Sequence, residues 1–370
     1  MKNNLKYISQ LLLKKYLRRK KRILLGKRKI NISKRASKLG NKSKILEDIR
    51  IPSDLSFTEN WESVVETLNN IDYSLRYRFV DLKKSLSIDH SKMKSVSSAG
   101  ILVLASTIEC SQKIANVKFV GKEEFLPKND VIRYLLNEID YWKYFDVSKL
   151  STEITQKRFS FFKIIDSYEA DNTKIGKMIE FFSKKVGFNG ETRAHLYTAL
   201  SEAAANTIEH GYSNTSIKKD KINNRWWLTA NIDAKEQVIS FVFYDQGIGI
   251  FKSLESNKKD FLRNFFKKTK ALVKTNPHAK ILQRMLHENF SRHNTENRGY
   301  GLQTFKKFID ESEEGSLFIA SDNASYLYPS DTLQEYTHKL KGTLIVWKIK
   351  VGYDKSKNIY LKEEQKDEEI

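Results

Sequence analysis

The sequence is short of cysteine, proline, glycine and long apolar runs, and each shortage excludes a class of protein. A single cysteine among 370 residues, Cys110, excludes an intramolecular disulfide and a metal site built from several cysteines. The 4 prolines and 15 glycines exclude collagen-like and proline-rich architectures. The longest apolar run, Gly100–Ala105, is far below the ~18–20 residues of a membrane span. These absences predict a soluble protein of a reducing cytoplasm.

Acidic residues are missing from the start of the chain. Residues 1–46 contain 17 Lys and Arg and no Asp or Glu, whereas the other 324 residues carry a net charge of only +4. The overall charge of +21 therefore describes a basic tail on a nearly neutral body. Two interpretations of this tail, residues 1–50, are open: a solvated or disordered segment, or an amphipathic helix that attaches to an anionic membrane or to nucleic acid.

Residues 51–152 have the composition of a folded domain in which strands alternate with helices. We expect helices at 61–68, 98–115 and 131–145, and strands at 76–82, 85–89 and 117–120. This alternation predicts an α/β domain. A polar stretch at 151–157 predicts the linker to the next domain.

A second domain, residues 158–352, has a different order of elements. We expect helices at 173–186, 191–210 and 302–310, and strands at 159–165, 226–233, 238–244, 316–321 and 342–350. This order predicts an α+β sandwich, in which one layer of helices covers a mixed or antiparallel sheet. Residues 353–370 form a charged tail.

The helix predicted at 191–210 carries the first candidate site residues. Glu202 and Asn206 are four residues apart and therefore share one helix face. A carboxylate and a carboxamide one turn apart suit Mg²⁺, which takes few protein oxygens and keeps several waters. The same carboxylate could instead orient a water or hydroxyl for attack on a phosphate.

Two glycine-rich turns carry the other candidates. Asp245 ends a hydrophobic strand and precedes Gly247 and Gly249, which allow a ligand to approach the backbone closely. A carboxylate at a strand end can accept a hydrogen bond from an exocyclic amine. Gly299 and Gly301 stand before a helix, where backbone N–H groups point at a phosphate.

In this order, the three segments resemble the N, G1 and G2 boxes of the GHKL ATPase superfamily. Gly342-Thr343 resembles the Gly-Thr pair that closes the adenine pocket in that superfamily, so the resemblance covers residues 159–350. It implies that the domain binds ATP and Mg²⁺ as cofactors. It also implies a fold in which a layer of helices covers a mixed sheet. The implied roles are Asn206 as Mg²⁺ ligand, Glu202 as general base, Asp245 and Thr343 for adenine, Gly247 and Gly249 for base and ribose, and Gly299 and Gly301 for the phosphates.

Within the superfamily, residues 187–211 look most like the anti-sigma-factor serine kinases. A sensor histidine kinase is disfavoured, because residues 51–157 contain only His90, which stands beside a predicted strand. The segment between the second and third boxes, the lid at 251–298, is longer than in the compact anti-sigma kinases and has a net charge of +8. It is either a solvated, mobile lid or a source of bases for the triphosphate or an acidic partner.

The first domain is similar to STAS domains, the modules on which such kinases act. The similarity rests on residues 86–90 followed by 96–104. Ser98 falls on the serine that the partner kinase phosphorylates and Gly100 on the glycine that follows, whereas Ser97 replaces the usual Asp. A serine at a helix start also serves as an N-cap, so two roles are open for Ser98.

These patterns favour an ATP- and Mg²⁺-binding regulatory protein, acting as a serine kinase or as a nucleotide-gated switch. Its expected partner is a regulatory protein of the STAS or sigma-factor type. One alternative is an ATPase clamp that works as a homodimer. The other alternative is a cytoplasmic adaptor protein, attached to a membrane or to nucleic acid through residues 1–46.

Overall fold

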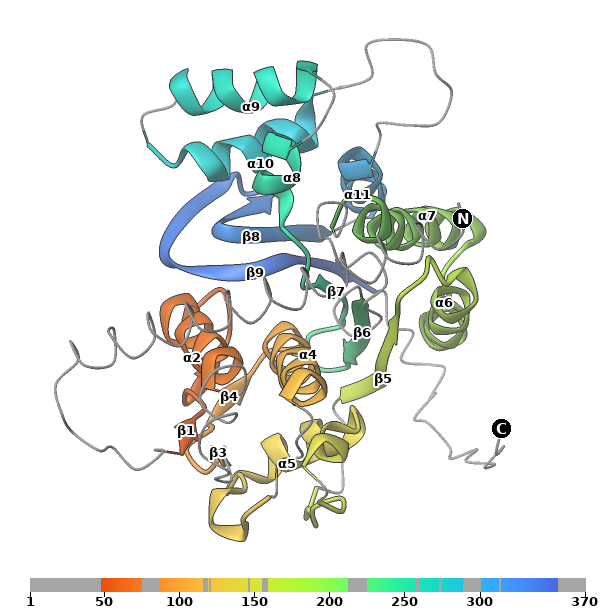
Figure 1. Cartoon of the computed structure of the whole chain (residues 1–370). Coiled ribbons are helices and arrows are strands. Elements are labelled where there is room, and N and C mark those ends of the chain that lie inside the picture. The colour runs from red at the N-terminus through yellow and green to blue at the C-terminus, as the bar shows by residue number, and fades with distance from the viewer. Residues whose placement is uncertain are drawn as a thin grey trace, which may run out of the picture. The chain divides into compact units, whose positions relative to one another are not determined.

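The structure is a computed structural model, shown in Figure 1. It describes residues 48–74, 87–115, 119, 121–145, 147–154, 159–211, 225–256, 260–272, 275–288, 301–312 and 314–351. Asp48–Ile370 group by their contacts into one unit. The predictions for the tails at 1–50 and 353–370 therefore fall almost entirely outside the described residues. In the part of the chain that is described, no helix is both long and apolar enough to cross a membrane.

The N-terminal region is built around one buried helix, α4 (Ser98–Ala115), which spans the predicted range. Four two-residue strands lie beside its start, and they form two parallel pairs. The first pair is β1 (Ile49–Arg50) with β3 (Ile88–Asp89), and the second is β2 (Asp54–Leu55) with β4 (Ser95–Val96). A Cβ at Gly100 would lie 2.1 Å from the Leu55 carbonyl oxygen, so only glycine fits where α4 meets β2.

Other predictions for this region need correction or cannot be followed. The helix α2 (Trp61–Tyr73) runs longer than 61–68, and of the strand expected at 85–89 the structure describes 87–89, where β3 covers Ile88–Asp89. The strand expected at 76–82 lies outside the described residues, and of 117–120 only Phe119 is described, without regular structure.

A single helix over 131–145 is wrong. Asp140 has a left-handed backbone (φ 62), which a right-handed helix cannot accommodate. The segment therefore divides into α5 (Asp130–Glu138) and the 3₁₀ turn η3 (Tyr141–Tyr144), after a short 3₁₀ turn η2 (Glu123–Phe125).

The C-terminal region contains a five-stranded sheet in the order β5-β6-β7-β9-β8, and every neighbouring pair is antiparallel. The strands are β5 (Phe159–Ser167), β6 (Trp226–Asp233), β7 (Val238–Asp245), β8 (Gly315–Tyr328) and β9 (Thr332–Lys350). The sheet is thus antiparallel rather than mixed. The predicted starts of β5 and β6 are confirmed, whereas β8 and β9 together form a hairpin much longer than predicted.

Helices cover one face of this sheet, as predicted. They are α6 (Asn172–Val186), α7 (Gly190–Asn206) and α11 (Gly301–Asp310), seen to the right of the sheet in Figure 1. Alternate residues of β6, among them Trp226, Leu228 and Ala230, enter the same core as the buried faces of these helices. The period of two in a strand places the residues between them on the opposite face.

The N-terminal region packs on that opposite face. Trp227 Nε1 donates to Glu109 Oε2 of α4 at 3.0 Å, and Arg225 Nη1 lies 3.0 Å from Glu109 Oε1. On β9, Tyr336 stacks on Trp61 of α2, with ring centroids 4.1 Å apart. The sheet is therefore covered on both faces, by α2 and α4 on one face and by α6, α7 and α11 on the other (Figure 1).

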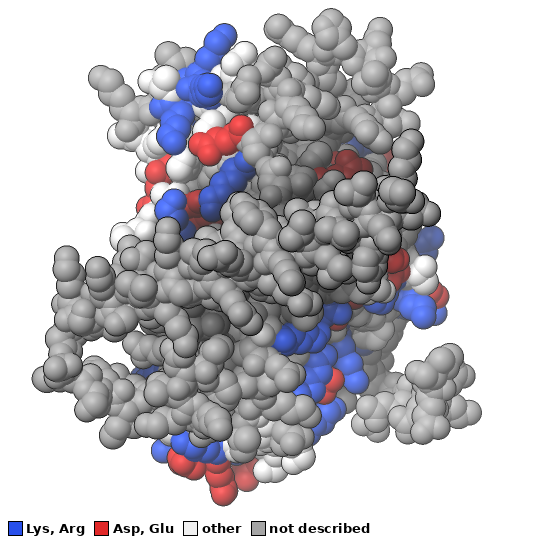
Figure 2. Space-filling view, in the orientation of Figure 1, with Lys and Arg blue, Asp and Glu red and all other residues white. Residues whose placement is uncertain are grey.

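The described part of the predicted lid is largely helical. It contains α8 (Ile250–Ser256), α9 (Asp260–Leu272) and α10 (Pro277–His287). Its apolar residues Leu254, Phe266 and Leu282 are buried in the same core as the hairpin. The lysines of α9 that are described, Lys267, Lys268 and Lys270, are exposed, and Figure 2 shows basic side chains at the upper left, where Figure 1 places α9. A fully solvated lid therefore does not fit the described residues of 250–287.

Candidate functional site

The helix α7 supplies Glu202 and Asn206. It starts at Asn189, whose side chain accepts a hydrogen bond from Thr192 N at 2.7 Å, as an N-cap residue does. Asn206 Nδ2 donates to Glu202 Oε1 at 3.2 Å, and both side chains are half-buried. This bond fixes the amide so that its oxygen is the atom that Asn206 can offer to a cation.

The regular helix ends at Asn206, earlier than the predicted 210. It continues as a turn of π-helix, Thr207–Gly211. Gly211 then accepts a hydrogen bond from Ile248 N at 2.8 Å, which ties the end of α7 to the turn after β7. The π turn is thus the point where the first candidate segment meets the second.

Asp245 lies at the end of β7, buried to 5% exposure and opposite Thr343 of β9. Burial raises the pKa of its carboxyl to about 6, while hydrogen bonds from Gly247 N–H and from the Thr343 hydroxyl and N–H act to lower that pKa. Gly247 N donates to Asp245 Oδ1 at 2.7 Å. A buried carboxylate with oriented donors is a well-defined acceptor for a polar ligand.

The glycines of this turn are required by close backbone contacts. A Cβ at Gly247 would lie 2.6 Å from the Gly211 carbonyl oxygen, and one at Gly342 would lie 1.9 Å from the Asp245 carbonyl oxygen. Gly249 and Gly342 both have φ +79, in the left-handed region that favours glycine. The turn is thus held in place from α7 on one side and from β9 on the other.

One residue that the sequence did not single out, Ser321, connects these parts. Its Oγ accepts a hydrogen bond from Ile250 N at 3.0 Å and donates to the Gly342 carbonyl oxygen at 2.9 Å. The side chain is fully buried in β8, opposite Thr343. A serine inside an apolar strand was the one available signal, but nothing in the sequence indicated that β8 would lie beside the turn.

The structure describes only part of the third candidate segment, which contains Gly299 and Gly301. Gly299 lies outside the described residues, and Gly301 is the first residue of α11. The phosphate-binding roles of both glycines remain predictions. The structure brings together the other segments: Gly211 after α7, the turn with Asp245, Gly247 and Gly249, and Thr343.

Ser98, by contrast, lies on the other side of the sheet. Its Oγ donates to Asn231 Oδ1 of β6 at 2.5 Å, and Asn231 alternates with the β6 residues that face α7. The helix α4 is capped instead by Ser97, whose Oγ accepts from Gly100 N at 3.0 Å. Ser98 is therefore not the N-cap, and it does not lie near Glu202 in this arrangement.

His90 is buried to 1% exposure within the N-terminal region. Its Nε2 lies 2.8 Å from Tyr141 Oη, and the rings of Trp142 and Phe145 are adjacent. Burial lowers the pKa of its imidazole to about 4. An imidazole enclosed in this way is not accessible to a phosphate donor on another domain, which agrees with the expectation that a sensor histidine kinase is disfavoured.

Comparison with known proteins agrees with this geometry. Residues 168–315 match the family model described as "Histidine kinase-like ATPase domain". The match spans α6, α7, β6, β7 and the start of β8. A search of curated proteins finds no match to the chain. At residues 168–315 the chain contains a histidine kinase-like ATPase domain, whereas the STAS resemblance of residues 52–150 remains a prediction.

Proposed function

We propose that the histidine kinase-like ATPase domain of this chain binds ATP with Mg²⁺ and serves as an ATP-dependent regulator of the anti-sigma-kinase type. Asp245 carries the proposal. It is the buried carboxylate at a strand end, held by Gly247 N–H and Thr343, in a turn whose glycines pack closely on the backbone of Gly211 and Asp245. Such an acceptor suits the exocyclic amine of adenine.

The donor set on α7 fits Mg²⁺. The amide oxygen of Asn206 and the Glu202 carboxylate are hard oxygen ligands on one helix face, joined by the 3.2 Å hydrogen bond. Asn206 would hold the ion, which neutralises charge on the triphosphate when bound. Glu202 would act as the general base on the attacking hydroxyl or water. Gly301, at the N-terminus of α11, and Gly299 would face the phosphates.

The phosphate acceptor belongs to a partner protein in this proposal. Ser98 is hydrogen-bonded to Asn231 on the sheet face away from α7, so transfer within the chain would require the N-terminal region to leave the sheet. A serine of a separate regulatory protein, of STAS or sigma-factor type, meets no such barrier. The two regions in contact across the sheet could then act as a nucleotide-gated switch for that partner.

Calorimetry with Mg²⁺-ATP tests the binding. We expect saturable binding to the unaltered chain and its loss in Asp245→Asn, because an amide offers one acceptor oxygen and places its NH₂ against the donors. Asp233→Asn is the matched control, because Asp233 pairs with Val238 at the opposite end of the β6–β7 ladder from Asp245. Absence of binding by the unaltered chain would sink the proposal.

Labelled ATP then separates the activities. We expect label on a supplied partner, or free phosphate, to disappear in Glu202→Ala and to persist in Ser98→Ala. Label that stays on the chain itself and is lost in both variants would contradict transfer to a partner.

A further inference from the structure

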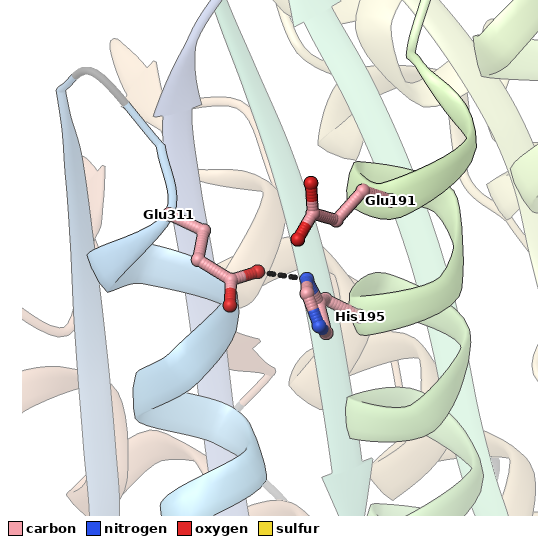
Figure 3. Close-up of side chains that lie close together, drawn as sticks. All are labelled: Glu191, His195 and Glu311. Carbon is pink, nitrogen blue, oxygen red and sulfur yellow. Dashed lines mark ion pairs between the residues drawn. The ribbon is translucent and has the colours of Figure 1, made fainter.

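A second group of chemically active side chains lies on α7, toward its N-terminal end. Glu191 and His195 belong to α7, and Glu311 directly follows α11. One ligand atom from each of the three lies within 4.8 Å of the others. Figure 3 shows the three side chains converging between the two helices. None of them has a role in the proposed nucleotide site.

The backbone holds this group in place. Glu191 and His195 are four residues apart and therefore share a helix face. The helices α7 and α11 both pack on the sheet, where Leu196 and Leu200 of α7 share one core with Phe308 and Ile309 of α11. A site built on packed helices keeps its geometry better than one built on loops.

His195 is the central member of the group. Its side chain is 17% exposed, and its Nδ1 atom is buried. Glu311 Oε2 lies against this nitrogen as an ion pair, marked by the dashed line in Figure 3. The other oxygen of Glu311 lies 3.6 Å from Lys307 Nζ, which leaves Oε2 directed at the imidazole.

We propose that Glu191, His195 and Glu311 bind a divalent transition-metal ion, with Zn²⁺ the best match. Imidazole nitrogen is a ligand that Zn²⁺ takes readily and that Mg²⁺ and Ca²⁺ do not favour. Two carboxylates offset the charge of the ion. Three protein ligands leave a position for water, as in open zinc sites.

This site is separate from the one that would hold Mg²⁺ with ATP. His195 and Asn206 are eleven residues apart on α7, about 16 Å along the helix axis. The ion would join α7 to the C-terminal end of α11, whose N-terminal end begins at Gly301. It would thereby fix the packing of the two helices that carry the proposed nucleotide-binding residues.

Cobalt binding to the full chain, without ATP or Mg²⁺, tests the site. Co²⁺ replaces Zn²⁺ and reports its ligands by visible absorption. After treatment with a chelator, we expect one equivalent of Co²⁺ to bind with a low-coordinate spectrum, and Zn²⁺ to displace it. We expect His195→Ala and Glu311→Gln each to weaken binding by more than the roughly 10–100-fold typical of residues that only support a ligand.

Two controls separate this site from others. His287→Ala removes a histidine that lies 4.0 Å from Asp331 elsewhere in the fold, and Glu180→Gln removes an exposed carboxylate of α6. Both variants should bind Co²⁺ as the unaltered chain does, and circular dichroism should show all variants folded. Equal Co²⁺ binding by His195→Ala, or no saturable binding by the unaltered chain, would overturn the proposal. Neither result depends on ATP binding.

Discussion

Asp245 shows how one residue links the stability of the fold to ligand binding. Its carboxyl has a pKa near 6 in the folded chain, against 3.8 for an ordinary Asp. The folded state therefore binds the proton more tightly than the unfolded state. The free energy of unfolding therefore falls as pH rises from about 4 to about 6, and this loss of stability reaches its full size above pH 6.

We predict that the stability of Asp245→Asn relative to the unaltered chain rises by up to about 3 kcal/mol between pH 4 and pH 8, because an amide carries no charge to desolvate. The comparison is between the two pH values, because the hydrogen bonds that the amide changes contribute equally at both. Thermal unfolding at the two pH values checks this. A difference that is the same at both would show that Asp245 is ionised without cost.

Ser321 is the residue whose role emerged only in three dimensions. Ser321→Ala would leave Ile250 N and the Gly342 carbonyl without their shared partner, and an unsatisfied buried group costs about 1–3 kcal/mol. We predict a lower melting temperature and an ATP dissociation constant raised about tenfold, since the turn would lose its support.

Ser325→Ala is its control. Ser325 is also buried in β8, and its hydroxyl is bonded to Tyr336 Oη, away from the turn. Its loss should lower stability without weakening ATP binding. If both variants bound ATP equally well, Ser321 would have no part in positioning the turn.

At the scale of elements, one carboxylate of α4 makes two of the polar contacts that join this helix to the sheet. Glu109 is 12% exposed, pairs with Arg225 at 3.0 Å and accepts from Trp227 Nε1 at 3.0 Å. Without Glu109, Trp227 Nε1 would lose its acceptor, while Arg225 would keep Asp166 Oδ2, 3.0 Å from its Nη2. This makes Glu109 the place where the attachment of the N-terminal region can be tested.

We predict that Glu109→Ala lowers the free energy of unfolding by about 1–3 kcal/mol, measured by denaturant titration. Glu180→Ala is the comparison, because Glu180 pairs with Lys184 on the exposed surface of α6 and such pairs contribute less than about 1 kcal/mol. Equal effects of the two substitutions would show that the α4 contact contributes little.

At the scale of the whole molecule, the N-terminal region and the ATPase domain share one sheet as their packing surface. We therefore predict one cooperative unfolding transition for both regions, seen as a single calorimetric peak. Two separated peaks would show that the contacts of α4 and α2 with the sheet are too weak to couple them.

The titration of His90 offers a second test of whether the N-terminal region and the ATPase domain unfold together. Its pKa is lowered by burial to about 4, against 6.5 for the unfolded chain, so stability falls as pH drops from about 6.5 to 4. The loss reaches about 3 kcal/mol. We predict that His90→Gln flattens this part of the stability profile. If the regions are coupled, fluorescence of Trp226 and Trp227, which lie in the sheet, will follow the same pH dependence.

Local patterns in the sequence were enough for much of the ATPase domain. The helical spacing of α6 and α7 and the alternation in β6 and β7 act between neighbours in the chain. The motifs around Glu202, Asn206 and Asp245 were visible because each depends on residues a few positions apart. The sequence alone also determined the concentration of positive charge in residues 1–46.

The tertiary structure decided what depends on distant parts of the chain. The length of the β8–β9 hairpin, the break at Asp140 and the packing of the lid helices follow from contacts that no local pattern contains. So does the position of Ser98, which the sheet separates from Glu202, and the meeting of His195 with Glu311. Side chains more than a hundred residues apart come together only because one sheet is covered on both faces, and burying both faces is what the hydrophobic effect favours.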